Sequence, residues 1–156
     1  MNDSYLWLKW LHVISATVLL GTGAGIAFFF LRAHQTRDVR VIAAVSRDVV
    51  LADMIFTASA VIVQPLTGFA MAAMVGFPTA SFWIRTSLVL YCVVGACWLP
   101  VVWLQVRMRD LARRALAEGT ELPAAYRRYF RWWCGLGWPA FIGVLAILYL
   151  MIAKPF

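Results

Sequence analysis

The stretch Tyr5–Gln35, YLWLKWLHVISATVLLGTGAGIAFFFLRAHQ, decides the fold of this chain. No residue from Val13 to Leu31 carries a charge, and about 20 apolar residues in a helix, rising 1.5 Å each, cross the hydrocarbon layer of a bilayer. The stretch therefore predicts a transmembrane helix. Lys9 and His12 lie in its first turns, where an ionisable group is unfavourable unless it finds a partner or water. These two side chains are the first candidates for a functional role.

The composition of the whole chain indicates an integral membrane protein. Of its 156 residues, 63% are hydrophobic and 13% are charged, whereas a soluble domain carries about 25% charged residues. Aromatic residues make up 15% and gather near the ends of the apolar runs, as in the interfacial belts of membrane proteins. A formal charge of +7 would suggest nucleic-acid binding in a soluble protein. Because the arginines here lie between apolar runs, we interpret them as a topology signal and expect no nucleic-acid partner.

Three further apolar runs follow the first, separated by short polar segments. They predict membrane spans at about residues 5–31, 49–75, 83–106 and 132–153, with connections at 32–48 and 107–131. The first connection is expected to continue as an amphipathic helix outside the hydrocarbon. The second contains a turn at Glu118-Gly119-Thr120 and a helix restart near Pro123. We expect an all-α fold: one integral membrane domain over residues 1–156, arranged as a four-helix up-down bundle surrounded by membrane lipids.

The distribution of basic residues predicts the orientation of this bundle. Eleven of the fourteen lysines and arginines lie in the two connections. Because short cytoplasmic connections are enriched in lysine and arginine, the connections are expected to face the cytoplasm. Both termini are then periplasmic, and the expected location is a bacterial inner membrane. The three cysteines, Cys92, Cys97 and Cys134, lie in apolar runs without a Cys-x-x-Cys spacing, so we expect free thiols.

The outer ends of the predicted spans bring together residues that suit a haem group. Lys9 and His12, three positions apart, share a helix face, and Arg85 enters the third span at a similar depth. Counting residues along the helices places Gly68 and Met71 of the second span, Tyr91 of the third and Tyr149 of the fourth near the level of His12. A neutral imidazole is a good ligand for haem iron, and basic side chains near the surface suit its two propionates. The residues predict a haem b site with His12 as the metal ligand and Lys9, Arg85, Met71 and Tyr91 as further cofactor-binding candidates.

A simpler interpretation of the same residues stays open. Lys9 and Arg85 can extend to the lipid headgroups while His12 hydrogen-bonds a neighbouring helix. His34 cannot complete a bis-histidine site with His12, because the 22 residues between them correspond to about 33 Å of straight helix. Met71 or a water are therefore the candidates for a sixth iron ligand. Because His34 lies among arginines, we expect it to be exposed.

Asp53 is the single carboxylate inside a predicted span. Thr57 and Gln64 follow it on one helical stripe, and Gln105 of the third span comes to about the same depth. Two interpretations are open for Asp53: an ion pair with a connection arginine such as Arg131, or a role in a proton relay.

The segment Gly21–Gly25, GTGAG, does not indicate nucleotide binding. It has neither a preceding strand nor the context of a phosphate-binding loop. The spacing of Gly21 and Gly25 instead allows close approach of another helix. That helix can belong to a second copy of the chain, so a homodimer is one of the expected assemblies.

The start of the first span, YLWLKWLHV, and its end, FFFLRAHQ, resemble the first helix of the J-type protoporphyrinogen oxidases, small haem-containing membrane proteins. Tyr5, Lys9, His12 and His34 match positions of that family's pattern. The resemblance implies that His12 is a haem ligand. In the third span, Trp83-Ile84-Arg85-Thr86-Ser87 stands where the oxidases have a second histidine and lysine.

The whole chain resembles more closely a bacterial family of predicted integral membrane proteins, a domain of unknown function. The segments QPLTGFAM, SLVLY and WLPVVWLQVRMR carry this resemblance. It implies an integral membrane protein and no particular chemistry.

These observations lead to two expected functions. The first is a haem b-binding inner-membrane protein that acts with a redox partner in electron transfer or porphyrin oxidation, which would make it a haem-dependent oxidoreductase. The second is a non-enzymatic scaffold or partner-binding subunit whose outer cleft holds lipid or a partner's helix. A transporter is less well supported, because His12 and Asp53 lie near opposite ends of the bundle.

Overall fold

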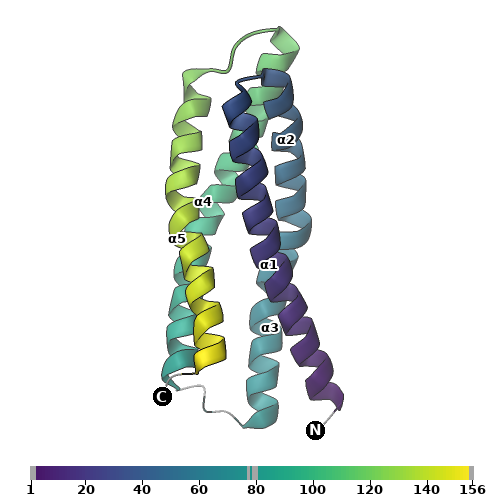
Figure 1. Ribbon diagram of the computed structural model, residues 1–156, viewed down its shortest axis with the longest axis vertical. Coiled ribbons are helices and arrows are strands. Elements are labelled where there is room, and N and C mark those ends of the chain that lie inside the picture. Colours follow the sequence, from purple (N-terminus) through teal and green to yellow (C-terminus); the bar gives the residue numbers. More distant parts are fainter. Residues whose placement is uncertain (1–2, 77, 79–80, 155–156) are drawn as a thin grey trace.

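The computed structural model describes residues 3–76, 78 and 81–154, and this part of the chain is helical almost throughout. Its elements are α1 (Asp3–Thr36), α2 (Val39–Ala52), the π-helical turn η1 (Asp53–Thr57), α3 (Ala58–Val75), α4 (Phe82–Glu118) and α5 (Ala124–Ala153). Because α2, η1 and α3 follow one another without a break, they form one long rod beside the other helices (Figure 1). Four helices, Asp3–Thr36, Val39–Val75, Phe82–Glu118 and Ala124–Ala153, are long and apolar enough to cross a membrane. The predicted four-helix membrane bundle is confirmed.

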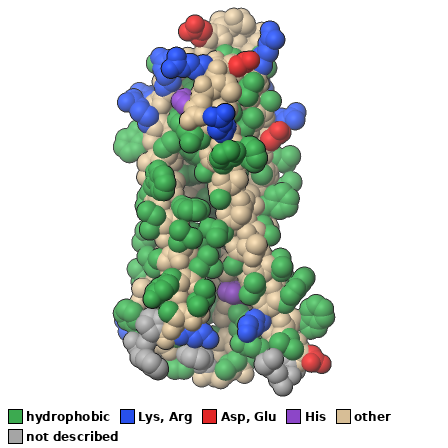
Figure 2. Space-filling model, in the orientation of Figure 1, with side chains coloured by type: hydrophobic (Ala, Val, Ile, Leu, Met, Phe, Trp, Pro, Cys, Tyr) green, Lys and Arg blue, Asp and Glu red, His purple; other side chains and the backbone are tan. Residues whose placement is uncertain are grey.

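The two ends of the bundle differ in what they contain (Figure 1). One end, here the basic end, holds the break between α1 and α2 and the turn between α4 and α5. The other end, here the terminal end, holds the start of α1, the end of α3, the start of α4 and the end of α5. Figure 2 shows lysine and arginine side chains at both ends and a broad hydrophobic surface between them. Large exposed side chains on this surface include Phe29, Ile62, Val89 and Ile142, as expected for helices that contact lipid.

Backbone geometry explains where the helices stop at the basic end. Arg37 has a φ of 58° and Gly119 a φ of 64°, values that cannot continue a right-handed helix. α2 then begins behind Asp38, whose carboxylate accepts a hydrogen bond of 2.8 Å from the backbone N–H of Arg40. The turn at Gly119 and the restart after Pro123 confirm the sequence prediction. The first connection is helical as expected, but it is divided at Arg37 and each part continues a long helix.

The bulky hydrophobic core lies in the half of the bundle nearer the basic end. Phe30 of α1 is fully buried, and its ring centroid lies 5.2 Å from that of Trp133 and 5.8 Å from that of Phe130 on α5. Met108 and Tyr126 are fully buried in the same cluster. Buried aromatic side chains contribute large apolar areas, so this half dominates the packing.

The half nearer the terminal end is packed around smaller side chains. Its buried residues include Ser15 of α1, Thr67 of α3 and Ser87 of α4. At Gly143 of α5, a Cβ atom would come within 2.5 Å of Cγ2 of Val94 on α4. The α4–α5 contact at this point therefore requires glycine.

Candidate functional site

His12 lies on α1 against α3, in the half nearer the terminal end. Its Nδ1 is 2.7 Å from Oγ1 of Thr67. Gly68 completes the contact, because a Cβ atom there would lie 3.4 Å from Cε1 of the imidazole. The glycine thus presents a flat surface to the ring, and the threonine fixes the ring's rotation. The sequence prediction that Gly68 comes to the level of His12 is confirmed.

The hydrogen-bond pattern favours one tautomer of His12. The Thr67 hydroxyl donates to the carbonyl oxygen of Val63 at 2.7 Å. Since a hydroxyl has one hydrogen, Thr67 then accepts from Nδ1–H of the imidazole. In this tautomer Nε2 carries a lone pair, and no hydrogen bond to it is formed by a described residue. A histidine with one nitrogen held by hydrogen bonding and the other bare has the form of a metal-binding imidazole.

The backbone at His12 is held by Gln64 of α3. Nε2 of Gln64 donates to the carbonyl oxygen of His12 at 2.8 Å and to Oγ of Ser15 at 2.6 Å. Ser15 itself donates to the same carbonyl at 3.0 Å. His12, Ser15, Gln64 and Thr67 therefore form one polar network between α1 and α3, called here the His12 network.

The other predicted haem-site residues lie outside this network. Lys9 and Arg85 are exposed, and Met71 is half-buried one turn beyond Thr67 on α3. The Tyr91 hydroxyl of α4 donates to the carbonyl oxygen of Val61 on α3. Among the described residues, no hydrogen bond or ring contact joins His12 to Arg85, Met71 or Tyr91. Within the same described part, no three His, Cys, Asp or Glu side chains gather in a way that would hold a metal ion.

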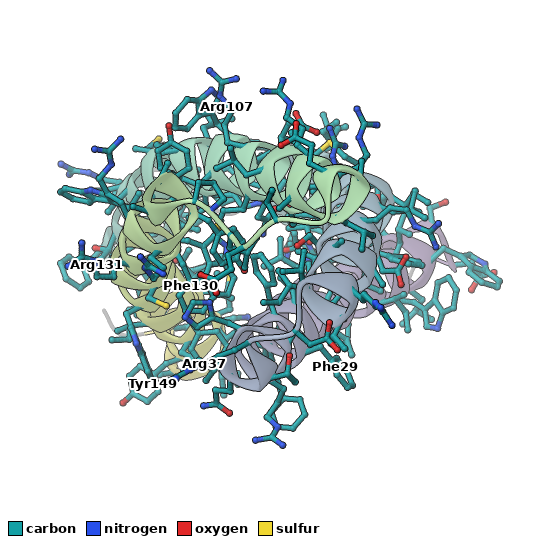
Figure 3. The ribbon with its side chains drawn as sticks, turned by 90° about the horizontal axis from the view of Figure 1, so that it is seen from above. Phe29, Arg37, Arg107, Phe130, Arg131 and Tyr149 are labelled. Atoms are coloured by element: carbon teal, nitrogen blue, oxygen red, sulfur yellow. The ribbon has the colours of Figure 1, made fainter. Side chains whose placement is uncertain are left out.

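Tyr149, which the sequence placed at the level of the outer cleft, faces away from it. Its side chain is 69% exposed, and Figure 3 shows it pointing outward from α5. Residue counting gave its depth along the helix but not the side of the helix on which it lies.

A second polar cluster surrounds Asp53, where α2 passes into η1. Asp53 is buried, with 3% of the residue exposed. Nε1 of Trp98 on α4 donates to its Oδ1 at 3.4 Å. With its amide oriented to match its neighbours, Gln105 donates to Oδ2 at 3.0 Å and accepts from Nε1 of Trp133 on α5 at 3.3 Å. Asp53, Trp98, Gln105 and Trp133 are called here the Asp53 cluster, and the predicted approach of Gln105 to Asp53 is confirmed.

The predicted ion pair between Asp53 and Arg131 is wrong. Arg131 is exposed and points away from the bundle in Figure 3. The ion pairs of the described residues are instead between sequence neighbours, Arg47 with Asp48 and Arg109 with Asp110. Arg131 lies on the outer side of α5, whereas Trp133, two residues later, faces inward. Asp53 is therefore met by neutral donors and not by a cation.

The prediction that His34 is exposed is also wrong. Its ring stacks on Phe130 with centroids 3.7 Å apart and an angle of 7° between the planes. Its Nδ1 is buried without a hydrogen-bond partner, as is the hydroxyl of the neighbouring Tyr126. The apolar stacking surface on α5 draws the imidazole inward although its sequence neighbours are charged.

Four residues of these sites were missed in the sequence: Ser15, Thr67, Trp98 and Trp133. Ser15 carried a signal, because it lies three positions after His12 on the same helix. Thr67 carried a usable signal, because it lies three positions after Gln64 on the same helix. Trp98 lies well inside an uncharged run and not at its edge, which sets it apart from interfacial tryptophans. Trp133 carried no such signal, since it lies at the start of the predicted fourth span, where tryptophans at the membrane–water interface are expected.

The three cysteines are free thiols, as predicted. The glycines Gly21, Gly23 and Gly25 have nothing within 4 Å of the position a Cβ atom would take. The predicted close helix contact at Gly21 and Gly25 is therefore not made within the chain.

Comparison with known families identifies the class of protein. The family described as "Predicted integral membrane protein (DUF2269)" matches residues 6–155. The chain belongs to this family. No curated protein and no solved structure matches the chain. Membership of DUF2269 confirms the closer of the two resemblances, and with the four apolar helices it makes the chain an integral membrane protein. For this DUF2269 member, the likeness of α1 to the oxidases stays a prediction.

Proposed function

We propose that this protein binds haem b in a bacterial inner membrane, with Nε2 of His12 as the protein ligand to iron, and serves electron transfer or porphyrin oxidation. The observation that carries the proposal is the bond between Nδ1 of His12 and Thr67. Histidines that bind metals almost always use their second nitrogen in a hydrogen bond that fixes the tautomer. Here that bond comes from a neighbouring helix, so the orientation of the free nitrogen is fixed by the fold.

The basic end of the bundle faces the cytoplasm in this proposal. Eleven of the fourteen basic residues belong to the segments that meet at this end, and short cytoplasmic segments are enriched in such residues. The His12 network then lies in the periplasmic half of the membrane. Both termini are periplasmic, and a redox partner would approach from that side.

The residues around His12 fit a haem group in kind. Small buried side chains at Ser15, Thr67 and Ser87 leave this half without the bulky aromatic packing of the other. Lys9 and Arg85 are exposed cations near the terminal end and suit carboxylate groups. Met71 and Tyr91 are further candidates for contact with the porphyrin ring. When bound, haem would supply one-electron redox chemistry, and the protein would orient it and limit access of water.

The test is an absorption spectrum of protein purified from haem-supplemented cells. A Soret band is expected in the wild type, and His12→Ala should abolish it. His34→Ala is the matched control and should keep the band, because His34 is near the other end of α1. A colourless wild-type preparation, or a spectrum unchanged by His12→Ala, would refute haem binding through His12.

A second candidate function is a non-enzymatic scaffold or partner-binding subunit. The open surface at Gly21 and Gly25 favours it, because glycines four positions apart allow another membrane helix to approach closely. Gly21→Leu should then abolish cross-linking to a partner or to a second copy, without a change in any chromophore. If cross-linking is the same in the variant, this surface is not an interface.

A further inference from the structure

The Asp53 cluster combines three features that the proposed haem site does not use. The carboxyl group is buried, it lies in an element that crosses the membrane, and its described contacts come from neutral groups. Its turn is π-helical, with the N–H of Ala58 bonded to the carbonyl oxygen of Asp53, five residues earlier. Such turns interrupt regular helices and are frequent at functional sites.

The helices packed around Asp53 supply no counter-charge. α1 packs against η1 and is uncharged from Val13 to Leu31. α4 is uncharged from Thr86 to Val106, and α5 from Trp132 to Ala153. The titratable or charged groups nearest the cluster in sequence are the half-buried thiols of Cys97 and Cys134 and the exposed Asp48, Arg107 and Arg131. An ionised carboxylate here would depend on neutral donors alone, those of Trp98, Gln105 and Thr57, which is unfavourable in a medium of low dielectric constant.

Thr57 provides what a neutral carboxylic acid would need. Its hydroxyl lies near the Asp53 carboxyl in the same turn, is buried, and has no hydrogen-bond partner. A protonated carboxyl needs an acceptor for its O–H, and a hydroxyl can accept that bond. The same hydroxyl can donate to the carboxylate once the proton has left. Thr57 therefore serves both protonation states, whereas the Trp98 indole can only donate to the carboxyl oxygens and the Gln105 amide donates to them in the orientation that matches its neighbours.

We propose that Asp53 is a reversible proton-binding site inside the membrane, protonated at neutral pH, with Thr57 as the positioning residue for its proton. The proton comes from water and returns to water. The only bond formed on binding is the O–H bond of the carboxyl, and the charge of the site changes from −1 to 0. The site does not depend on haem.

Infrared spectroscopy of the purified full-length protein in lipid nanodiscs tests this at pH 7. The other six Asp and Glu side chains are exposed or half-exposed, so none of them shares the buried position of Asp53. The wild type should show the C=O band of a protonated carboxyl, which shifts in D2O and on carboxyl-¹³C labelling of aspartate. Raising the pH with the helices intact should remove the band. The labelling requires no substitution, so it shows whether the band comes from a protonated aspartate even if a variant fails to fold.

Variants then assign the band. Asp53→Asn should remove it, and the matched control Asp48→Asn should leave it unchanged. Thr57→Val should keep the band but move it, because the acid proton loses its acceptor. Absence of the band at pH 7, its persistence in Asp53→Asn, or a band that neither D2O nor high pH alters would overturn the proposal. A band at the wild-type position in Thr57→Val would overturn the role of Thr57.

Discussion

Gln64 on α3 and His12 on α1 are joined by a hydrogen bond of 2.8 Å between the Gln64 amide and the His12 carbonyl oxygen, across 52 residues of sequence. The His12 carbonyl oxygen therefore accepts a hydrogen bond from a side chain of a second helix. The bond ties the two halves of the first helical hairpin together at the level of the candidate site, away from the bulky core.

Gln64→Leu should destabilise the protein by about 1 kcal/mol, because it removes two hydrogen bonds between membrane helices without opening a large cavity. Thermal unfolding in detergent, followed by circular dichroism, measures the change. Ile62→Ala, on the exposed face of the same helix, is the control and should change the unfolding temperature little. An equal loss in both variants would mean that the Gln64 bonds contribute nothing specific.

Thr67→Val should leave the fold intact but weaken haem retention about 10-fold to 100-fold, the range typical for loss of a hydrogen bond that orients a metal-binding histidine. Valine has nearly the shape of threonine, so the substitution removes the acceptor at Nδ1 and little else. Haem titration of the purified apoprotein gives the affinity. If Thr67→Val binds as tightly as the wild type, Thr67 does not orient a ligand.

Gly143→Ala should destabilise the α4–α5 contact by about 1–3 kcal/mol, because the new methyl group would overlap Cγ2 of Val94 at 2.5 Å. Valine is stiff at χ1 and cannot easily turn away. The second substitution Val94→Ala should restore most of the loss. At Gly135 nothing lies within 4 Å of an added Cβ, so Gly135→Ala should be tolerated. Chemical unfolding of the wild type, Gly143→Ala, Gly143→Ala with Val94→Ala, and Gly135→Ala gives the free energies of unfolding to be compared.

Phe130→Ala should be the most damaging of these changes, costing about 3–5 kcal/mol. Its ring is 6% exposed and contacts His34, Phe30 and Trp133. Trp132→Ala removes a larger side chain that is 63% exposed, and should cost far less. Similar losses in the two variants would contradict the assignment of the core to this half of the bundle.

The sequence predicts those parts of the structure that depend on local pattern. The four spans follow from hydropathy, and the turn at Gly119 follows from the residues that end helices. Counting along helices also gave correct depths for Gln105 beside Asp53 and for Gly68 beside His12.

What the sequence could not give is the rotation of each helix and the choice among partners at one depth. Arg131 and Trp133 lie at similar depths, but only the tryptophan faces inward, so the predicted partner of Asp53 was wrong. His34 was misplaced for a related reason: its charged neighbours indicate exposure, while its actual environment is set by Phe130, 96 residues later. Such contacts depend on tertiary packing.

The rod made of α2, η1 and α3 carries residues of both polar sites. Asp53 and Thr67 are separated by about 20 Å of helix axis, and no loop lies between them. A small axial slide or twist that follows a change of charge at Asp53 would reach the threonine that holds His12. The rod thus offers a mechanical link between the two polar sites within one continuous stretch of backbone.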